Sequence, residues 1–347
     1  MAIIRIFHSK PTIGPKDTAG IVQVLKTNHL SQGEKVLEFE NKISQYCNVK
    51  GAVAVNSGTS ALHLALLAMG IGRGDEVIIP SYVCSALLNP IFYAGAVPRI
   101  VDVNFEDFNI SPVEAKKQIT KKTKAIIVPH LFGYPADVKE LLRLGVPVIE
   151  DCAQSLGARY QGKKAGSLGL LSICSFYATK VLTTGEGGMV LSNQFKLLDK
   201  IRDLREYDNI SAYKVRYNYK MTDIQAMLGL SQFSQLKYFL ARRKEIAQVY
   251  DSALENFQIT TPHKEPDRDH IYYRYVVKIK KGRREVWQRL KNRGIESVSP
   301  VFKPLHRYFD KNKCPVSDEL MKRCLSIPIY PSLTDIQIQY IINSLEK

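Results

Sequence analysis

A single lysine, Lys180, separates two apolar runs in the segment CSFYATKVLTTGEGGMVLSN, residues 174–193. Lysine is rarely buried unless its charge is paired, removed or used in chemistry. The segment therefore indicates either a connecting loop whose lysine faces solvent or a lysine that forms a Schiff base with a carbonyl cofactor. Residues elsewhere in the chain discriminate between these two interpretations.

Gly58, Thr59 and Ser60 follow the apolar run AVAV (52–55) and stand at the start of a helix-like segment. A helix N-terminus offers free backbone N–H groups and a favourable dipole for a phosphate, and the two hydroxyls add further donors. Taken alone, the motif SGTS is better explained as a plain helix cap.

Asp151 and Gln154 come at the end of another apolar run, in VIEDCAQSLGA. By itself, such a carboxylate indicates a helix cap. If a pyridine ring lies beside it, Asp151 would pair with the ring nitrogen and keep it protonated, which strengthens the electron withdrawal that a carbanion-stabilising cofactor requires. Gln154 would then hydrogen-bond the ring hydroxyl.

Ser175 and the turn GEGG (185–188) flank Lys180 on its two sides. Glycine lets a turn bend sharply and lets the backbone approach a ligand closely. The combination of a lysine, a phosphate site, a ring-nitrogen partner and a glycine turn favours a Schiff base to pyridoxal phosphate.

The elements that position these residues are predicted by seven apolar runs. Runs of this length, alternating with amphipathic segments, predict a mostly parallel α/β sheet covered on both faces. Ligands of such sheets bind outside the carboxyl ends of the strands, where the three motifs are expected to converge. The runs are AVAV (52–55), EVIIP (76–80), PRIVDV (98–103), KAIIVP (124–129), PVIED (147–151), SICSF (172–176) and GMVLS (188–192).

A helical pattern from about Thr222 to Leu254 leads away from the predicted sheet. Beyond it, IYYRYVVKIK predicts a strand, REVWQRLKNRG a helix closed by Gly294, and LTDIQIQYIINSLEK a terminal helix. These patterns predict a large α/β domain over residues 1–241 and a small α+β domain over residues 242–347.

The composition fits a soluble globular protein, with 45% apolar and 24% charged residues in a chain of 347. No apolar run approaches the roughly 20 residues of a membrane span. Six dispersed cysteines without metal-ligand spacing favour a reduced cytoplasmic protein that holds no metal. The net charge of +16 comes without any nucleic-acid-binding motif, so it indicates a solvated basic surface or attraction of a phosphate-bearing substrate.

Nearly the whole chain resembles the DegT/DnrJ/EryC1/StrS family of pyridoxal-phosphate-dependent nucleotide-sugar aminotransferases. The resemblance implies the fold-type I architecture, in which a mostly parallel seven-stranded sheet domain is followed by a smaller α+β domain. It rests on long motifs in the family's order: LSQGEKVLEFE, NSGTSALHLAL, GDEVIIPSY, AGAVPRIVDV, HLFGYPADV, IEDCAQSLGA, SFYATKVLTTGEGG, YNYKMTDIQAMLG, KPLHRYF and LSIPIYPSLTD.

The resemblance implies roles for the residues at matching positions. Lys180 matches the Schiff-base lysine, while Asp151 and Gln154 match the partners of the ring nitrogen and the ring hydroxyl. Asn218, in YNYKMTD, matches an asparagine that reaches the phosphate from the neighbouring subunit, which implies a homodimer with shared active sites. The remaining phosphate contacts correspond to Gly58, Thr59, Ser60 and Ser175.

Three positions depart from the family's common pattern. Cys84 stands in PSYVCSA where many members have an aromatic residue that stacks on the cofactor, and Tyr177 stands where histidine is common. Lys220 replaces a frequent arginine, which removes a planar bidentate donor. Tyr177, Lys220 and also His306, in the KPLH segment that lies near the substrate entrance in family members, are candidate substrate contacts.

The implied reaction is transamination with glutamate as the expected amino donor. Lys180 holds pyridoxal phosphate as a Schiff base, the donor converts it to pyridoxamine phosphate, and this form aminates a keto sugar carried by a nucleoside diphosphate. The same motifs fit an aminotransferase of a cyclitol ketone or of an aromatic-precursor ketone. A sugar dehydrase of the family would carry histidine in place of Lys180, and a basic regulatory protein on the same fold would bind DNA without cofactor absorbance.

Overall fold

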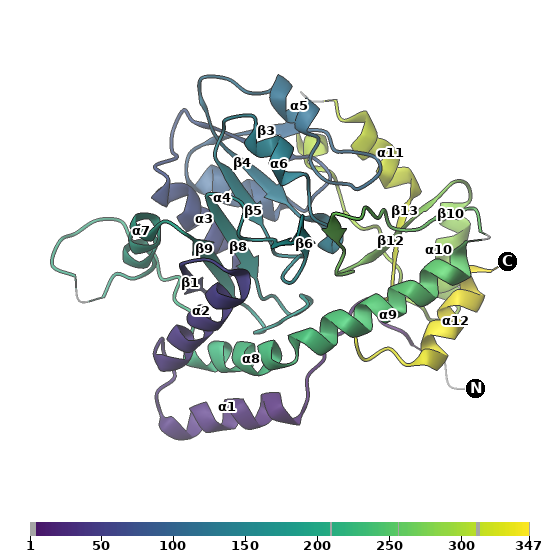
Figure 1. The fold of residues 1–347 in the computed structure, drawn as a ribbon, viewed down its shortest axis with the longest axis horizontal. Coiled ribbons are helices and arrows are strands. Elements are labelled where there is room, and N and C mark those ends of the chain that lie inside the picture. The colour runs from purple at the N-terminus through teal and green to yellow at the C-terminus, as the bar shows by residue number, and fades with distance from the viewer. Residues whose placement is uncertain (1–4, 209, 256, 310–312, 347) are drawn as a thin grey trace.

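Seven strands form one sheet in the order β1-β9-β8-β5-β4-β2-β3 in the computed structural model, which describes residues 5–208, 210–255, 257–309 and 313–346 (Figure 1). Every apolar run predicted as a strand is found in this sheet, and the ends agree within two residues. The strands are β1 (Gly51–Val55), β2 (Glu76–Pro80), β3 (Val97–Val101), β4 (Thr123–Pro129), β5 (Val148–Asp151), β8 (Leu171–Ser175) and β9 (Gly188–Ser192).

The sheet is mostly parallel, as predicted, and β9 is the exception. β9 pairs antiparallel with both β1 and β8, whereas the pairs β8-β5, β5-β4, β4-β2 and β2-β3 are parallel. Since β9 is reversed against both of its neighbours, β1 and β8 run in the same direction. The carboxyl ends of β1, β8, β5 and β4 therefore lie along one edge of the sheet.

Helices cover both faces of this sheet, which explains why its strands are apolar at nearly every position. Alternate strand residues point to opposite faces: Val53 and Val55 of β1 pack in the same cluster as α3, while Ala52 and Ala54 pack with α2. On the first face lie α3 (Gly58–Ala68), α4 (Leu88–Tyr93) and α7 (Phe195–Arg205). On the second face lie α2 (Glu34–Cys47), α5 (Pro112–Lys117) and α6 (Val138–Leu142).

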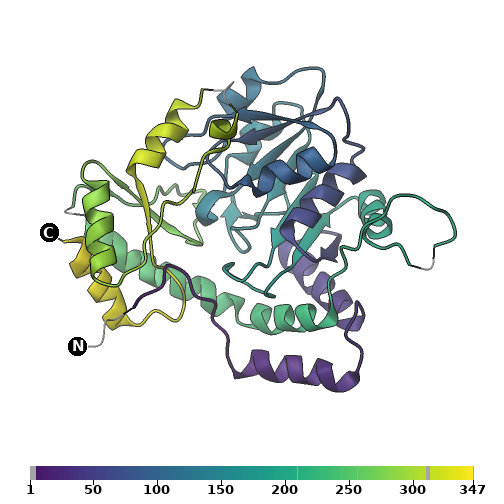
Figure 2. The same cartoon turned by 180° about the vertical axis from the view of Figure 1, so that it is seen from behind.

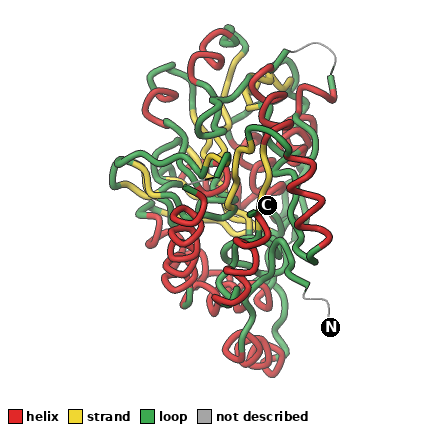
Figure 3. The backbone as a smooth tube through the Cα atoms, turned by 90° about the vertical axis from the view of Figure 1, so that its right-hand side faces the viewer, coloured by secondary structure: helices red, strands yellow, loops and turns green. Residues whose placement is uncertain are grey.

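The helical pattern predicted from Thr222 to Leu254 is present but is divided at Gln235. α8 (Asp223–Ser234) begins with a reciprocal capping box between Thr222 and Gln225, and α9 (Leu236–Leu254) continues from it towards the smaller part of the molecule. Figures 1 and 2 show that α9 continues nearly end to end from α8 and that α1 (Pro15–Thr27) lies below α8. In the side view of Figure 3, α1 is again the lowest helix.

The C-terminal region forms its own small sheet with helices on it. Ile6, near the other end of the chain, joins this region through a parallel bridge to Ile295. The limits 1–241 and 242–347 remain a prediction, with residue 241 inside α9. The sheet has the order β10-β12-β13, and its elements are β10 (Ile259–Thr260), β12 (Tyr275–Ile279), β13 (Cys324–Ile327), α10 (Arg283–Asn292), α11 (Pro315–Arg323) and α12 (Asp335–Leu345).

A third, short sheet joins the two parts of the molecule in the order β11-β6-β7. Its strands, which have two residues each, were not predicted; they are β6 (Arg159–Tyr160), β7 (Lys163–Lys164) and β11 (Arg268–Asp269). Throughout the described ranges, no helix combines the length and apolar character that crossing a membrane would require.

Candidate active site

A cavity of about 280 Å³ lies at the sheet edge where β1, β4, β5 and β8 end. The three motifs predicted to converge do so here, because each follows one of these parallel strands. Val83, Leu87, Leu131 and Ile173 supply apolar walls. The predicted residues that line it are Gly58, Thr59, Cys84, Asp151, Gln154, Ser175, Tyr177 and Lys180.

The start of α3 forms a cradle that suits a phosphate. Ser57 caps this helix, since its Oγ accepts the Ser60 N–H at 3.0 Å. The N–H groups of Gly58 and Thr59 find no acceptor among the described residues. A Cβ added to Gly58 would lie 2.9 Å from the Cβ of Ser175, so glycine is what lets the helix start approach β8. Two free N–H groups and the helix dipole fit an anion.

Ser60 is arranged differently from its neighbours in the motif. Its hydroxyl donates to Oδ1 of Asn56 at 2.7 Å and lies 2.9 Å from Oγ of Ser57. It does not line the cavity and is buried. Its predicted phosphate contact therefore stays a prediction, and the hydroxyl would have to leave Asn56 to make it.

Asp151 is buried at the end of β5, with Oδ1 accepting the Ala153 N–H at 2.9 Å. Burial raises the pKa of this carboxyl, and the Ala153 N–H together with the positive charge of Lys180 offsets only part of that effect. A cationic partner in the cavity, such as a protonated ring nitrogen, would stabilise the carboxylate further.

Gln154 is fixed by the backbone of a neighbouring loop. Its Oε1 accepts the Phe132 N–H at 2.8 Å, which directs the amide while leaving its N–H groups without a partner among the described residues. A donor at this place suits a ring hydroxyl or phenolate, as the sequence predicted.

Behind Asp151 lies a buried pair, His130 and Glu150, that was not predicted. His130 Nδ1 accepts the Ala136 N–H at 3.1 Å, so its Nε2 carries the proton that is donated to Glu150 at 3.0 Å. Backbone N–H groups of Gly166 and Gly169 also donate to Glu150, and His130 and these N–H groups lower its pKa against the effect of burial. The pair therefore anchors the end of β5, the strand that carries Asp151, to the segment that follows β4.

Lys180 lies half-buried on the segment between β8 and β9, with its own N–H donating to the Tyr177 carbonyl at 2.8 Å. The glycine turn that follows brings the chain back to the cradle. Gly185 has φ +79°, and a side chain on Gly188 would collide with the carbonyl of Ser57. The lysine and the phosphate cradle therefore belong to main-chain segments in direct contact.

Cys84 and Tyr177, two of the departures from the family pattern, both line the cavity. Tyr177 is 47% exposed and is the only aromatic residue among the described lining residues. Around Cys84 the walls are aliphatic, from Val83 and Leu87. Contact with a planar cofactor on this side would therefore come from aliphatic groups and the cysteine.

Asn218 and Lys220 lie outside the cavity. Asn218 is exposed, and its carbonyl accepts an amide N–H of Asn56 at 3.3 Å. Lys220 donates to Asp208 at 2.8 Å and to Glu206 at 3.0 Å, and these bonds raise its pKa. Both residues lie near the end of the connection between α7 and α8, which extends away from the body (Figure 1).

His306 also lies outside the cavity and is buried. Its Nδ1 is 2.6 Å from Oγ of Ser81, and its Nε2 is 3.3 Å from a carboxylate oxygen of Asp318. His306 thus connects its own segment to Ser81, which follows β2, and to Asp318 of α11, so its contacts serve the structure. Its predicted role as a substrate contact stays a prediction.

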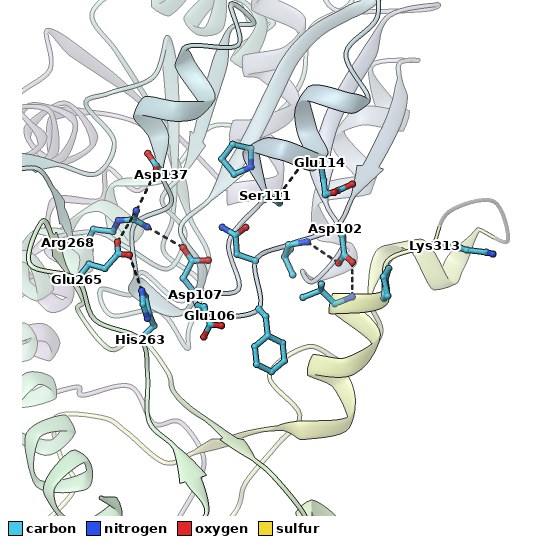
Figure 4. A pocket seen from close by; sticks show the side chains of 16 residues that line it. Asp102, Glu106, Asp107, Ser111, Glu114, Asp137, His263, Glu265, Arg268 and Lys313 are labelled. Carbon is cyan, nitrogen blue, oxygen red and sulfur yellow. Dashed lines mark hydrogen bonds and ion pairs between the residues drawn. The ribbon is translucent and has the colours of Figure 1, made fainter.

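A second cavity, of about 630 Å³, is larger but holds different chemistry (Figure 4). Arg268 lies at one end of it, 3.0 Å from Glu265, 3.2 Å from Asp107 and 3.6 Å from Asp137. At the other end, Asp102 accepts the N–H groups that begin α11. Its buried carboxylates are thus already partnered within the protein.

Tyr273 also lies at the lysine, although the sequence pattern predicts it only as part of a strand. The centre of its ring is 5.1 Å from Nζ of Lys180. No local pattern identified it, because it belongs to the C-terminal region and reaches the lysine only through the tertiary fold.

The chain matches a known family and known proteins over almost its full length. The model of the family described as "DegT/DnrJ/EryC1/StrS aminotransferase family" matches residues 11–346. The chain is 36% identical to the GDP-perosamine synthase of Escherichia coli O157:H7, covering 97% of each chain, and 37% identical to that of Caulobacter vibrioides, covering 99% and 98%.

A solved structure of a sugar aminotransferase in its PLP form shows the same fold. The putative sugar aminotransferase Spr1654 of Streptococcus pneumoniae in its PLP form superposes with a TM-score of 0.93 at 27% identity, covering 99% of this chain and 97% of that one. The fold-type I architecture and pyridoxal phosphate as cofactor are thereby confirmed, as is the expected activity, aminotransfer to nucleotide sugars. The chain belongs to the DegT/DnrJ/EryC1/StrS aminotransferase family.

Proposed function

We propose that Lys180 is the residue that holds pyridoxal phosphate and that the cavity around it transfers an amino group from glutamate to a keto sugar of a nucleoside diphosphate. The observation that carries this proposal is the meeting of Lys180, Asp151 and the α3 cradle in one cavity. The relatives named GDP-perosamine synthases make a GDP-linked keto sugar the first acceptor to test.

The cofactor would be held at both of its ends. Thr59, Ser175 and the free N–H groups at the start of α3 offer donors to the phosphate, and Asp151 offers a carboxylate to the ring nitrogen. Gln154, whose Oε1 is held by the Phe132 N–H, would donate from its amide to the ring hydroxyl. When bound, pyridoxal phosphate supplies an aldehyde that takes the amino group and a ring that withdraws electrons from the reacting carbon.

The protein's own residues then control position and proton transfer. Nζ of Lys180 would hold the aldehyde, and the free, neutral amine would move a proton at the reacting carbon. The aliphatic walls would limit the access of water to this proton transfer. Tyr177, half-exposed at the cavity, would contact the substrate.

Replacing Lys180 tests this proposal directly. Lys180→Ala should lose the near-visible absorption band of lysine-bound pyridoxal phosphate and at least about 10³-fold in turnover with glutamate and a keto sugar. Lys139→Ala, an exposed lysine on α6, is the matched control and should retain both. A normal band in Lys180→Ala would disprove the assignment.

We also propose a homodimer in the cytoplasm in which Asn218 completes the phosphate site of the partner subunit. Its exposure on the extended α7–α8 connection and its absence from the cavity of its own chain support this arrangement. All six cysteines are free, which fits a reducing compartment.

Mixing two inactive variants tests the shared site. If Lys180→Ala and Asn218→Ala are each inactive, hybrid dimers contain one intact site, and random mixing should restore about a quarter of the wild-type activity. Each variant refolded alone is the control. Failure of the mixture to regain activity would show that Asn218 serves the site of its own chain, and an active Asn218→Ala enzyme would show that it serves no site.

A further inference from the structure

The face of the Tyr273 ring lies next to the amine of Lys180. Nζ is 5.1 Å from the ring centre, and Oγ1 of the adjacent Thr179 is 3.4 Å from the tyrosine hydroxyl. Tyr273 is 7% exposed, so the contact is largely shielded from water. A cation within about 6 Å of an aromatic face is attracted by it, more strongly when water is excluded.

The chain that presents this ring is held in an unfavourable backbone conformation. Tyr272, the residue before it, has φ +52°, which is rare for a large side chain. The buried guanidinium of Arg243 fixes it by donating to the carbonyls of Tyr272 at 3.1 Å, Tyr273 at 3.2 Å and Ile329 at 2.9 Å. The His270 ring stacks on that of Tyr272 at 4.1 Å and accepts its N–H at 3.0 Å.

The same segment is bonded to the loop that orients Gln154. The Ile271 N–H donates to the Gly133 carbonyl at 3.0 Å, and the Arg274 N–H donates to the Phe132 carbonyl at 3.3 Å. Phe132 also has a positive φ, +59°, and its N–H is the one that Gln154 accepts. Two rare conformations therefore meet beside one cavity. Strain of this kind is retained where the surroundings enforce it, which is common at functional sites.

We infer that Tyr273 is a positioning residue for Lys180: its ring face holds the lysine amine, and the rigid segment behind it fixes the direction from which Nζ enters the cavity. This inference rests on the proposed role of Lys180. The electrostatics of the tyrosine agree with the geometry. Burial would raise the pKa of Tyr273, but the positive charges of Lys180 and Arg274 outweigh burial and lower it.

The alternative is that Tyr273 only fills space in the core. Tyr273→Leu removes the ring face, whereas Tyr273→Phe keeps the face and removes the hydroxyl. Tyr330→Leu is the matched control, since Tyr330 is also buried but packs in the C-terminal cluster and does not line the cavity. Thermal unfolding of each variant measures the stability that is lost with the ring.

The first measurement is the rate at which the cofactor-free enzyme binds pyridoxal phosphate, monitored by the growth of the near-visible absorption band. The second is the circular dichroism of that band, which reports the orientation of the bound cofactor. Tyr273→Leu should slow capture about fivefold and weaken the dichroism, while Tyr273→Phe stays within about twofold of wild type. Tyr330→Leu should lower the unfolding temperature and leave both signals unchanged. Equal capture and dichroism in Tyr273→Leu and wild type would overturn the inference, as would a Tyr273→Phe variant as slow as Tyr273→Leu.

If Tyr273→Leu does not fold, a fluorine series replaces it. Position 273 carrying 3,4,5-trifluorophenylalanine should capture the cofactor more slowly than Tyr273→Phe, because fluorine weakens the negative ring face at almost constant shape. Equal rates would contradict the inference. Lys180→Ala, measured alongside, separates the two proposals: if it still forms the lysine-bound band, the role of Lys180 fails, whatever Tyr273 does.

Discussion

Two cavities of this molecule, the candidate active site and the cavity around Arg268, differ in size and in how their polar groups are partnered. The larger one, of about 630 Å³, contains many carboxylates, yet Arg268 and the start of α11 already bind the buried ones. The smaller one, of about 280 Å³, leaves the Gly58 and Thr59 N–H groups and the Gln154 amide N–H groups without partners among the described residues. Buried groups normally find partners within the protein. The N–H groups without partners in the smaller cavity therefore indicate a ligand-binding site, whereas the paired carboxylates of the larger cavity indicate a structural role.

Substitutions in the two cavities should affect stability and activity in opposite ways. Substitutions in the smaller cavity should reduce activity while costing little stability, because these groups serve a ligand. Substitutions in the larger cavity should do the reverse. Natural enzymes show this trade between stability and function at their active sites.

The largest expected effect is that of Asp151→Asn, which should lower turnover by about 10³-fold because the ring nitrogen loses its charged partner. The same variant, free of cofactor, should be more stable than wild type at neutral pH. Burial raises the folded pKa of Asp151 above the unfolded value, so the charged carboxylate costs stability at pH 7. That cost should vanish as the pH falls below the unfolded pKa, where both states are protonated. Turnover and urea unfolding from pH 3 to 7 measure the two effects.

Asp137→Asn provides the control for this variant, since Asp137 lines only the larger cavity among the cavities described. Its turnover should equal that of wild type. An Asp151→Asn enzyme with normal turnover would remove the contrast between the cavities.

Next in size is Arg268→Met, which should lower the free energy of unfolding by about 3 kcal/mol. The substitution leaves the buried carboxylate of Asp107 without its cation. Adding Asp107→Asn should recover part of the loss, which a double-mutant cycle would measure by urea unfolding. A denaturation midpoint equal to that of wild type would show that the arginine is dispensable in the larger cavity.

A smaller loss, about 1–2 kcal/mol, is expected from Asp102→Ala. Asp102 accepts the N–H groups of Val316 at 2.8 Å and Ser317 at 2.9 Å at the start of α11. Those donors would lose their acceptor, and unfolding by urea with turnover measured in parallel would show the change. Loss of turnover without loss of stability would instead place Asp102 in a catalytic site.

The smallest effect should come from Glu114→Gln, at the rim of the larger cavity. Its ion pair with Lys117, at 2.7 Å, is exposed, and such pairs contribute little. The free energy of unfolding should change by less than about 0.5 kcal/mol at low salt, and the difference should shrink at 1 M salt. A change above 1 kcal/mol would mean that this rim is not a plain solvated surface.

The sequence predicted the sheet because its signals are local. Both faces of the strands are covered, so each strand is a short apolar run, and the motifs at their ends converge through parallel topology alone. The cavity residues Gly58, Asp151 and Lys180 followed from this, without any knowledge of side-chain positions.

Other features depend on tertiary contacts and could not be predicted in this way. The Ser60 hydroxyl prefers Asn56 to the cavity, and His306 is taken up by Ser81 and Asp318 from distant segments. Tyr273 reaches Lys180 only because a C-terminal segment folds back on the loop after β4. Choices among competing partners of this kind leave no periodic signal in the sequence.

The contact between Gly188 and the carbonyl of Ser57 has a consequence for how the family can diversify. Because the main chain itself sets the spacing between cradle and lysine, that spacing does not depend on the side chains around the opening. Substitutions at Cys84 and Tyr177 can therefore change which acceptor substrate binds without changing the distance between the lysine and the phosphate cradle.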